Sequence, residues 1–325
     1  MRAFKLMIAL FAVAAVQAHA GVTGFVDAQY RWHNTPASSN NFTSFDGAVW
    51  VTKEMGKGKA VLDLPWTINN GAVAFNGGKA QAYVNYGYDC GLDWTLGQFD
   101  SPLGVEANDS VNFNFSQQGL TYGVSPVAHQ GLMLNYANNG FSVKVAAANP
   151  NLLARTTGSA AVGTGGIANL EYFGQLKYAQ GNYWGAFGYL MHKNAVSTLT
   201  GSYIGLQAGM KMDQLSVDAA VGLIKSSITG ASTQSGTAIL LNANYKVNNT
   251  WNVSLRPEML SKAQGMYGAA ALPNDSVIQV TVGPQANMTD DLKVKFDYTF
   301  NSTKAVSGGT SVTTHQIGVA AVHKL

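Results

Sequence analysis

The sequence has few charged residues, a single cysteine and no long apolar run beyond its N-terminus. Only 11% of its 325 residues are charged, against about 25% in ordinary soluble domains. A disulfide scaffold is excluded, because Cys90 has no intramolecular partner. Membrane-spanning helices need about 20 consecutive apolar residues, and Asp, Asn, Lys or Gly interrupts every stretch after residue 20. Much of the surface must therefore avoid water in another way, or carry neutral polar side chains.

Residues 1–20 are predicted to be a cleaved secretory signal peptide. Arg2 and Lys5 precede an apolar core at 6–16, and the segment ends in small residues at 18–20. This core is too short to span a membrane. Without Arg2 and Lys5 the 20 basic residues fall to 18 against 17 acidic ones, a net charge of +1. Such a nearly neutral chain, residues 21–325, offers no electrostatic reason to bind nucleic acid.

From residue 21 onward, apolar and polar residues alternate with a period of two, which is typical of β-strands with one apolar face. The pattern is clearest in 26–32, 170–178, 251–258 and 292–300. Within each of these segments the charged residues share one parity, that is, they all have odd numbers or all have even numbers, so they lie on one face of the strand. A random scatter would put half of them on each parity. Residues 183–192 are apolar on both parities and fit less well. We therefore expect strands with one charged and one apolar face.

Short polar turns alternate with longer loops that are rich in Gly, Ser, Thr and Asn. The expected turns are 56–59, 89–91, 138–140, 179–182, 213–214, 248–249 and 287–291. The expected loops are 34–43, 67–79, 100–129, 149–168, 192–201, 225–236, 259–275 and 301–313. This all-β pattern predicts about sixteen antiparallel strands, and fourteen to eighteen are compatible with it.

The placement of aromatic residues favours a membrane barrel over a soluble sandwich. Tyr136 and Phe141 flank one expected turn, and Trp32 and Trp66 stand near long loops. Outer-membrane barrels carry aromatic girdles at both interfaces, short periplasmic turns and long extracellular loops. A secreted β-sandwich, the alternative, would need solubilising charges in its loops, yet loops 149–168 and 225–236 hold one charge each. We therefore expect a closed transmembrane barrel in a bacterial outer membrane, in contact with lipid and lipopolysaccharide.

One segment, 96–131, resembles the OmpL-like β-barrel porins. It contains a Gly-x-Phe strand end, a Ser-Pro-x-Gly-x-Glu stretch, an Asn-Phe-Ser stretch, and a Pro followed by His-x-Gly. The matching residues are Gly97, Phe99, Ser101, Pro102, Gly104, Glu106, Asn114, Phe115, Ser116, Pro126, His129 and Gly131. The resemblance implies a porin whose water-filled channel passes ions and small hydrophilic solutes by passive diffusion, without a cofactor. Analogy with sixteen-stranded porins implies a homotrimer. A barrel acting as an adhesin or receptor through its long loops is the alternative.

The third loop, 100–129, is the longest of the expected loops. In sixteen-stranded porins the third loop folds into the barrel and narrows it, so by analogy Asp100, Glu106 and Asp109 would stand in the pore constriction. An ordinary surface loop with three solvated acids is the alternative.

The parity that faces the lumen carries nearly balanced charge. Its basic residues are Arg31, Lys144, Lys177, Lys211, Lys246, Arg256, Lys293, Lys295 and Lys324. Its acids are Asp27, Asp63, Asp93, Glu171, Asp218, Glu258 and Asp297. With the three loop acids the balance is nine to ten, which predicts weak ion preference. We also expect the loop acids to face Arg31, Lys293, Lys295 and Lys324 across the pore, because the first and last strands are neighbours in a closed barrel.

Catalytic and metal sites are not predicted. The histidines at 33, 129, 192, 315 and 323 lack metal-ligand spacing. No mature histidine has a serine two residues later, unlike the outer-membrane phospholipase pattern. A Gly-x-Gly-x-x-Ala string at 163–168 precedes a strand, with no helix to receive a pyrophosphate. The sequence thus favours a channel over an enzyme.

Overall fold

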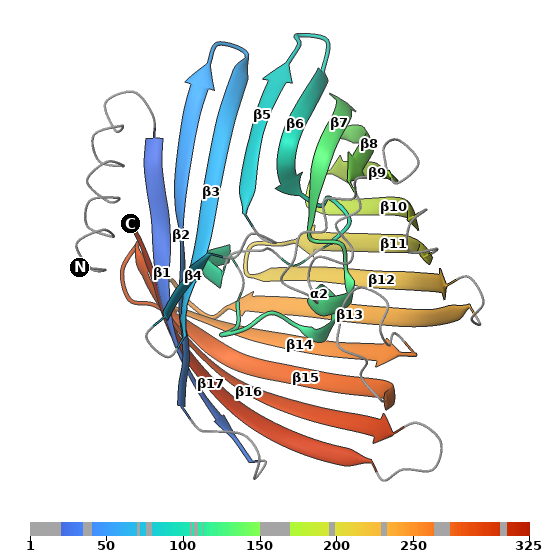
Figure 1. Ribbon diagram of the computed structural model, residues 1–325. Coiled ribbons are helices and arrows are strands. Elements are labelled where there is room, and N and C mark those ends of the chain that lie inside the picture. The colour runs from blue at the N-terminus through green and yellow to red at the C-terminus, as the bar shows by residue number, and fades with distance from the viewer. Residues whose placement is uncertain are drawn as a thin grey trace.

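The protein forms a closed antiparallel β-barrel (Figure 1). The computed structural model describes residues 21–34, 41–69, 72–75, 80–104, 106, 110–112, 114–149, 170–194, 199–228, 233–262, 274–305 and 311–325. Each strand pairs with its neighbour in the chain, and β1 (Gly21–His33) closes the ring by pairing with β17 (Val312–Lys324). Closure leaves no unpaired sheet edge, which a spanning β-structure requires in lipid.

The strands between these two follow the expected order of turns and loops. They are β2 (Asn41–Met55), β3 (Gly58–Asn69), β4 (Ala72–Phe75), β5 (Gln81–Gly87), β6 (Leu92–Asp100), β7 (Ala128–Asn138), β8 (Phe141–Asn149), β9 (Glu171–Gln180), β10 (Tyr183–Asn194), β11 (Leu199–Lys211), β12 (Leu215–Ile228), β13 (Gln234–Lys246), β14 (Trp251–Ser261), β15 (Asn274–Asn287) and β16 (Leu292–Ala305). Two short helices, η1 (Ser110–Asn112) and α2 (Leu120–Val124), lie between β6 and β7. Neither of these two helices is long enough to cross a bilayer.

The prediction of sixteen strands is confirmed. The sheet has 17 segments, but β4 pairs with the far half of β3 and β5 with its near half, so the two form one interrupted strand. All seven predicted short turns join strands as expected. In one of them Asn139 (φ 47°) and Gly140 (φ 81°) both have positive φ, as a two-residue type I′ hairpin requires.

The loop boundaries were predicted less well. Strands β3 and β4 occupy much of the expected loop 67–79. Seven other strands, β2, β10, β11, β12, β13, β14 and β16, extend three to five residues into the predicted loops. The reason is that a strand is held by backbone pairing, which continues beyond the level of the lipid. Apolar alternation marks only the part of the strand that faces the membrane.

The two faces of each strand differ as the alternation predicted. On β16, Phe296 and Tyr298 are each 42% exposed on the outer face, whereas the neighbouring Lys295 and Asp297 are buried inside. The outer, exposed side of this strand is therefore apolar and its charged side chains lie inside, which agrees with the low overall content of charge.

Part of the barrel interior is apolar. Phe173, Leu190, Tyr203 and other side chains from β9 to β15 form a buried cluster with Leu103 and Val124. This explains the poor alternation of 183–192, because the inward side chain of Leu190 packs against another protein segment and not against water. That segment is the connection between β6 and β7.

Candidate functional site

The connection between β6 and β7, called the third loop here, runs inside the barrel. Its helix η1 contacts β1 and β17, and α2 contacts β13 and β14. Figure 1 shows α2 within the ring of strands. Val111 of η1 packs with Phe25, Ala48 and Val322, while Val124 of α2 joins the larger apolar cluster. Two separate apolar contacts thus hold the loop against the barrel wall.

Arg256 on β14 is the ionic centre of the loop contact. Its Nη1 donates to Oε1 of Glu106 at 2.8 Å and to the carbonyl oxygen of Gln117 at 3.1 Å. Its Nε lies 3.1 Å from Oε2 of Glu258, two residues along the same strand. The guanidinium also lies over the Phe115 ring, 4.5 Å from its centroid. Arg256 is only 1% exposed, so loop residues shield this charge from water.

The two carboxylates around Arg256 also bind loop backbone. Both oxygens of Glu106 accept the Gly119 N–H at 3.1 Å. Oε1 of Glu258 accepts the N–H of Thr121 at 3.0 Å and its hydroxyl at 2.8 Å. Burial raises the pKa of Glu106 to about 7; the Arg256 charge opposes this shift and the Glu258 charge adds to it. The cluster fixes the start of α2 against β14.

A second polar contact fixes the loop to β16 and β17. The Ser116 N–H donates to Oδ2 of Asp297 at 2.6 Å, and Nζ of Lys293 donates to the Val111 carbonyl at 3.4 Å. Gly318 on β17 leaves the space that this contact needs, because a Cβ there would lie 2.2 Å from Oγ of Ser116. The loop therefore reaches a wall far from the strands that it connects.

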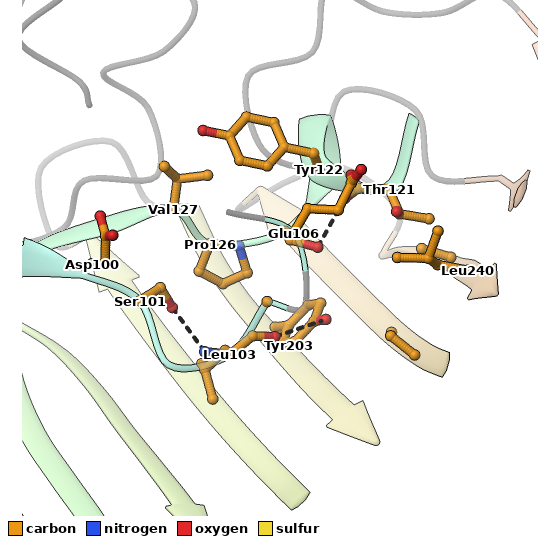
Figure 2. Close-up of a pocket in the computed structure, with 15 residues that line it drawn as sticks. Asp100, Ser101, Leu103, Glu106, Thr121, Tyr122, Pro126, Val127, Tyr203 and Leu240 are labelled. Carbon is orange, nitrogen blue, oxygen red and sulfur yellow. Dashed lines mark hydrogen bonds between the residues drawn. The ribbon is translucent and has the colours of Figure 1, made fainter. Parts of the chain in front are cut away.

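The base of the loop is tied to β9 through a buried histidine. His129 Nδ1 donates to Oε1 of Glu171 at 2.5 Å, and its Nε2 forms a hydrogen bond with Oγ of Ser101 at 2.9 Å. The Leu103 N–H donates to the same Ser101 oxygen at 3.2 Å (Figure 2). A carboxylate, an imidazole and a serine hydroxyl are joined in the same order in the catalytic triad of serine hydrolases. Here His129 is 1% exposed and its ring packs 4.3 Å from that of Phe173, which favours a structural tie between the two loop ends.

Two cavities border the loop. The smaller, of about 60 Å³, lies between the loop and β11–β13 and is lined by Asp100, Ser101, Glu106 and Tyr203 among others (Figure 2). The larger, of about 750 Å³, lies below Pro102 and Gly104 and extends to the turn between β7 and β8. We call it the vestibule. Its polar lining includes Asn135, Lys144, Gln175, Lys177, Trp184, Gln207 and Asp218.

The family of the protein follows from comparison with known families. A family model described as "Putative beta-barrel porin-2, OmpL-like" matches residues 20–324. The chain belongs to this OmpL-like porin family. The resemblance seen in residues 96–131 is thereby confirmed over nearly the whole chain, and the protein is an outer-membrane porin. No curated protein matches its sequence.

Solved porin structures share the fold at low sequence identity. The anion-selective porin from Comamonas acidovorans is 15% identical with a TM-score of 0.64, and the match covers 94% of this chain and 99% of that one. Outer-membrane expressed OmpT of Vibrio cholerae is 13% identical with a TM-score of 0.63, covering 94% and 97%. Salmonella typhi OmpF, solved in complex with daunomycin, is 11% identical with a TM-score of 0.65, also covering 94% and 97%.

The three loop acids predicted for the constriction of this porin lie in different settings. Asp100 ends β6 and is exposed beside the small cavity. Glu106 is buried against Arg256. Asp109 lies outside the described residues. The predicted partners of Glu106 are wrong, because it faces Arg256 on β14 and not Arg31, Lys293, Lys295 or Lys324. Among the predicted partners, Lys293 contacts the loop through the backbone carbonyl of Val111.

The nine basic residues predicted to line the pore fall into three groups by exposure. Arg256 and Lys295 are buried, at 1% and 0%. Those that are half-buried are Arg31, Lys144, Lys177 and Lys293, and those that are exposed at the turn-side ends of their strands are Lys211, Lys246 and Lys324. Arg31 donates to Oε1 of Gln29 at 2.6 Å.

Two features of the site were missed. The sequence gives no reason to pair His129 with Glu171, because 42 residues separate them. Trp184 was also overlooked, yet strand parity could have found it, because the outward Tyr183 places the next side chain inside. The described residues contain no group of three or more His, Cys, Asp or Glu side chains arranged to hold a metal ion.

Proposed function

We propose that the third loop sets the width of the channel, and that the cluster of Glu106, Arg256 and Glu258 holds it in place. The ion pair between Glu106 and Arg256 carries this proposal, because it joins the loop to a strand across the barrel interior. Loop contacts with β1, β13, β14 and β17 leave less room for solutes than the bare barrel would have. Asp100 and Asp109 are proposed as further acids of the constriction.

The test is conductance of the purified protein in a planar lipid bilayer. Stepwise current supports a channel, and liposome swelling with sugars of increasing size then measures its width. A variant without residues 105–119 should pass larger sugars than the wild type. An unchanged size limit would refute the constriction role of the loop. A folded barrel that conducts no current would instead favour the adhesin or receptor alternative.

The surroundings of the barrel are also proposals. The apolar outer face fits contact with outer-membrane lipid and lipopolysaccharide, and one solved relative, OmpT of Vibrio cholerae, is described as a trimer. We propose a homotrimer, which native mass spectrometry in detergent tests by the mass of the complex. Residues 1–20 are proposed as the signal peptide, and N-terminal sequencing of the mature protein should begin at Gly21.

A further inference from the structure

We propose that the vestibule contains a docking site for small oxyanions, either phosphate or carboxylate groups of permeating solutes, formed by Lys144 and Lys177. This inference rests on the proposed channel function and names a class of solute for it. The vestibule lies below the third loop and opens toward the turn between β7 and β8. It has the larger volume of the two cavities described above, about 750 Å³ against about 60 Å³, so it fits a passage for solutes.

The two lysines lie side by side on the same inward face. Lys144 on β8 pairs across the sheet with Gln175 on β9, and Lys177 follows two residues later. Side chains in such diagonal positions start about 7–8 Å apart, and each lysine charge acts on the other. Neither lysine forms a salt bridge within the described part of the chain. Two adjacent ammonium groups facing water repel each other, and an oxyanion between them relieves that repulsion.

Trp184 holds one of these lysines in place. Nζ of Lys177 lies 4.8 Å from the centroid of the Trp184 ring, a distance at which the ring face attracts a cation. The ring itself lies against Gly209, where a Cβ would be only 2.1 Å from the indole Nε1. The indole is hydrogen-bonded to the Asp218 carboxylate. The lysine thus rests on a fixed aromatic surface and does not move freely in the lumen.

Two acidic residues lie near the lysines, and their charges also act on an anion bound there. Asp93 accepts hydrogen bonds from Asn85 at 3.1 Å and Asn135 at 2.6 Å. Asp218 accepts a hydrogen bond from the indole of Trp184. These neutral donors occupy the carboxylates but leave their charge. The site is therefore weak, which suits a channel, because conduction requires that a bound solute also leave readily.

The charges elsewhere in the lumen make this pair stand out. Glu106 and Glu258 share Arg256, and Asp297 accepts a loop N–H. A solute in the vestibule therefore meets Lys144 and Lys177 together with the charges of Asp93 and Asp218, whereas the acids at the third loop are already engaged by Arg256 and by loop backbone.

The experiment measures ion selectivity and phosphate block in planar bilayers. Wild type is compared with the double variant Lys144→Gln/Lys177→Gln, and with Lys211→Gln/Lys246→Gln as a control that removes two lumen-side charges outside the vestibule. One charge about 7 Å from an anion in water changes the local anion concentration roughly threefold. The vestibule variant should lower the anion-to-cation permeability ratio, from the reversal potential in a KCl gradient, by about threefold to tenfold. The control should change it less than about twofold.

Inorganic phosphate provides the second readout. Added phosphate should reduce the chloride current of the wild type, and the concentration for half reduction should rise at least about threefold in the vestibule variant. Trp184→Ala should give part of this loss and Trp184→Phe should restore it, because phenylalanine keeps an aromatic surface below Lys177. These single variants also test the site if the double variant does not fold.

Each outcome separates the two proposals. A conducting wild type with the same permeability ratio and phosphate response as the vestibule variant would overturn the docking site and leave the channel intact. Equal losses in the vestibule variant and in the control would mean that total lumen charge, and not this pair, attracts anions. A folded wild type without conductance would overturn the channel function itself.

Discussion

Glu106 and Arg256, which are 150 residues apart in the sequence, form a buried ion pair of 2.8 Å inside the barrel. Arg256 also lies 3.1 Å from Glu258, so one guanidinium serves two carboxylates from different elements. Both carboxylates bind backbone N–H groups of the third loop. The position of the third loop therefore depends on the Arg256 side chain and on the two carboxylates that share its charge.

Replacing Arg256 by Met should release the third loop. Removing one partner of a buried ion pair typically costs about 3–5 kcal/mol, because the remaining charge is left uncompensated. Here two carboxylates would remain, and they escape that cost if the loop leaves the wall. We expect a higher single-channel conductance and a larger size limit for sugars. Glu106→Gln is the control, because an amide still accepts from Arg256. Equal conductance in Arg256→Met and the wild type would contradict this role.

Much of the fold could be predicted because a membrane barrel imposes one simple rule on every strand. Phe296 and Tyr298 lie exposed on the outer face while Lys295 and Asp297 are buried inside, and that alternation is visible in the sequence. Strand ends were harder, because backbone pairing continues where the lipid no longer selects apolar side chains. The segment 72–75 illustrates this, since it is a strand within a predicted loop.

The site was less predictable because strand parity contains no information about the path of a loop through space. Parity placed Arg256 in the lumen, but it could not show that Glu106 would reach it. Likewise, an apolar residue fits at the inward position 190 because Leu190 packs in one buried cluster with Leu103 of the loop. In the sequence alone, where the path of the loop is not known, an apolar residue at an inward position only disturbs the alternation of apolar and polar residues.

His129→Ala should destabilise the folded barrel by loosening the base of the loop. The substitution leaves Glu171, which is 0% exposed, without its donor and removes the ring that packs on Phe173. An unsatisfied buried polar group costs about 1–3 kcal/mol, and more when it is charged. The unfolding temperature should fall. It is measured as the temperature at which the protein stops migrating as a folded barrel in a detergent gel. His323→Ala, at an exposed strand end, is the control, and equal midpoints for the two variants would argue against the tie.

Channel conductance should depend on pH through Glu106. Burial raises the pKa of this carboxyl from 4.5 to about 7; Arg256 opposes the shift and Glu258 reinforces it. The docked loop therefore binds the proton more tightly than the released loop, so docking is strongest below pH 4.5 and weakens as the pH rises through about 7. Conductance or current noise should increase over that range. Glu106→Gln should remove this increase, and a variant that keeps the full pH profile would refute the assignment to Glu106.

Gly318→Ala should push the third loop away from β16 and β17. An added Cβ would lie 2.2 Å from Oγ of Ser116 and 2.5 Å from Oδ1 of Asp297, the two residues joined by a 2.6 Å hydrogen bond. Extra atoms in a packed interior typically cost about 1–3 kcal/mol, and the loop can avoid this strain by moving toward the lumen centre. Its displacement should change single-channel conductance and lower the unfolding temperature. Gly185→Ala makes the same substitution where the nearest atom is 3.8 Å away. If both variants behaved alike, the close fit between the loop and β17 would have no functional effect.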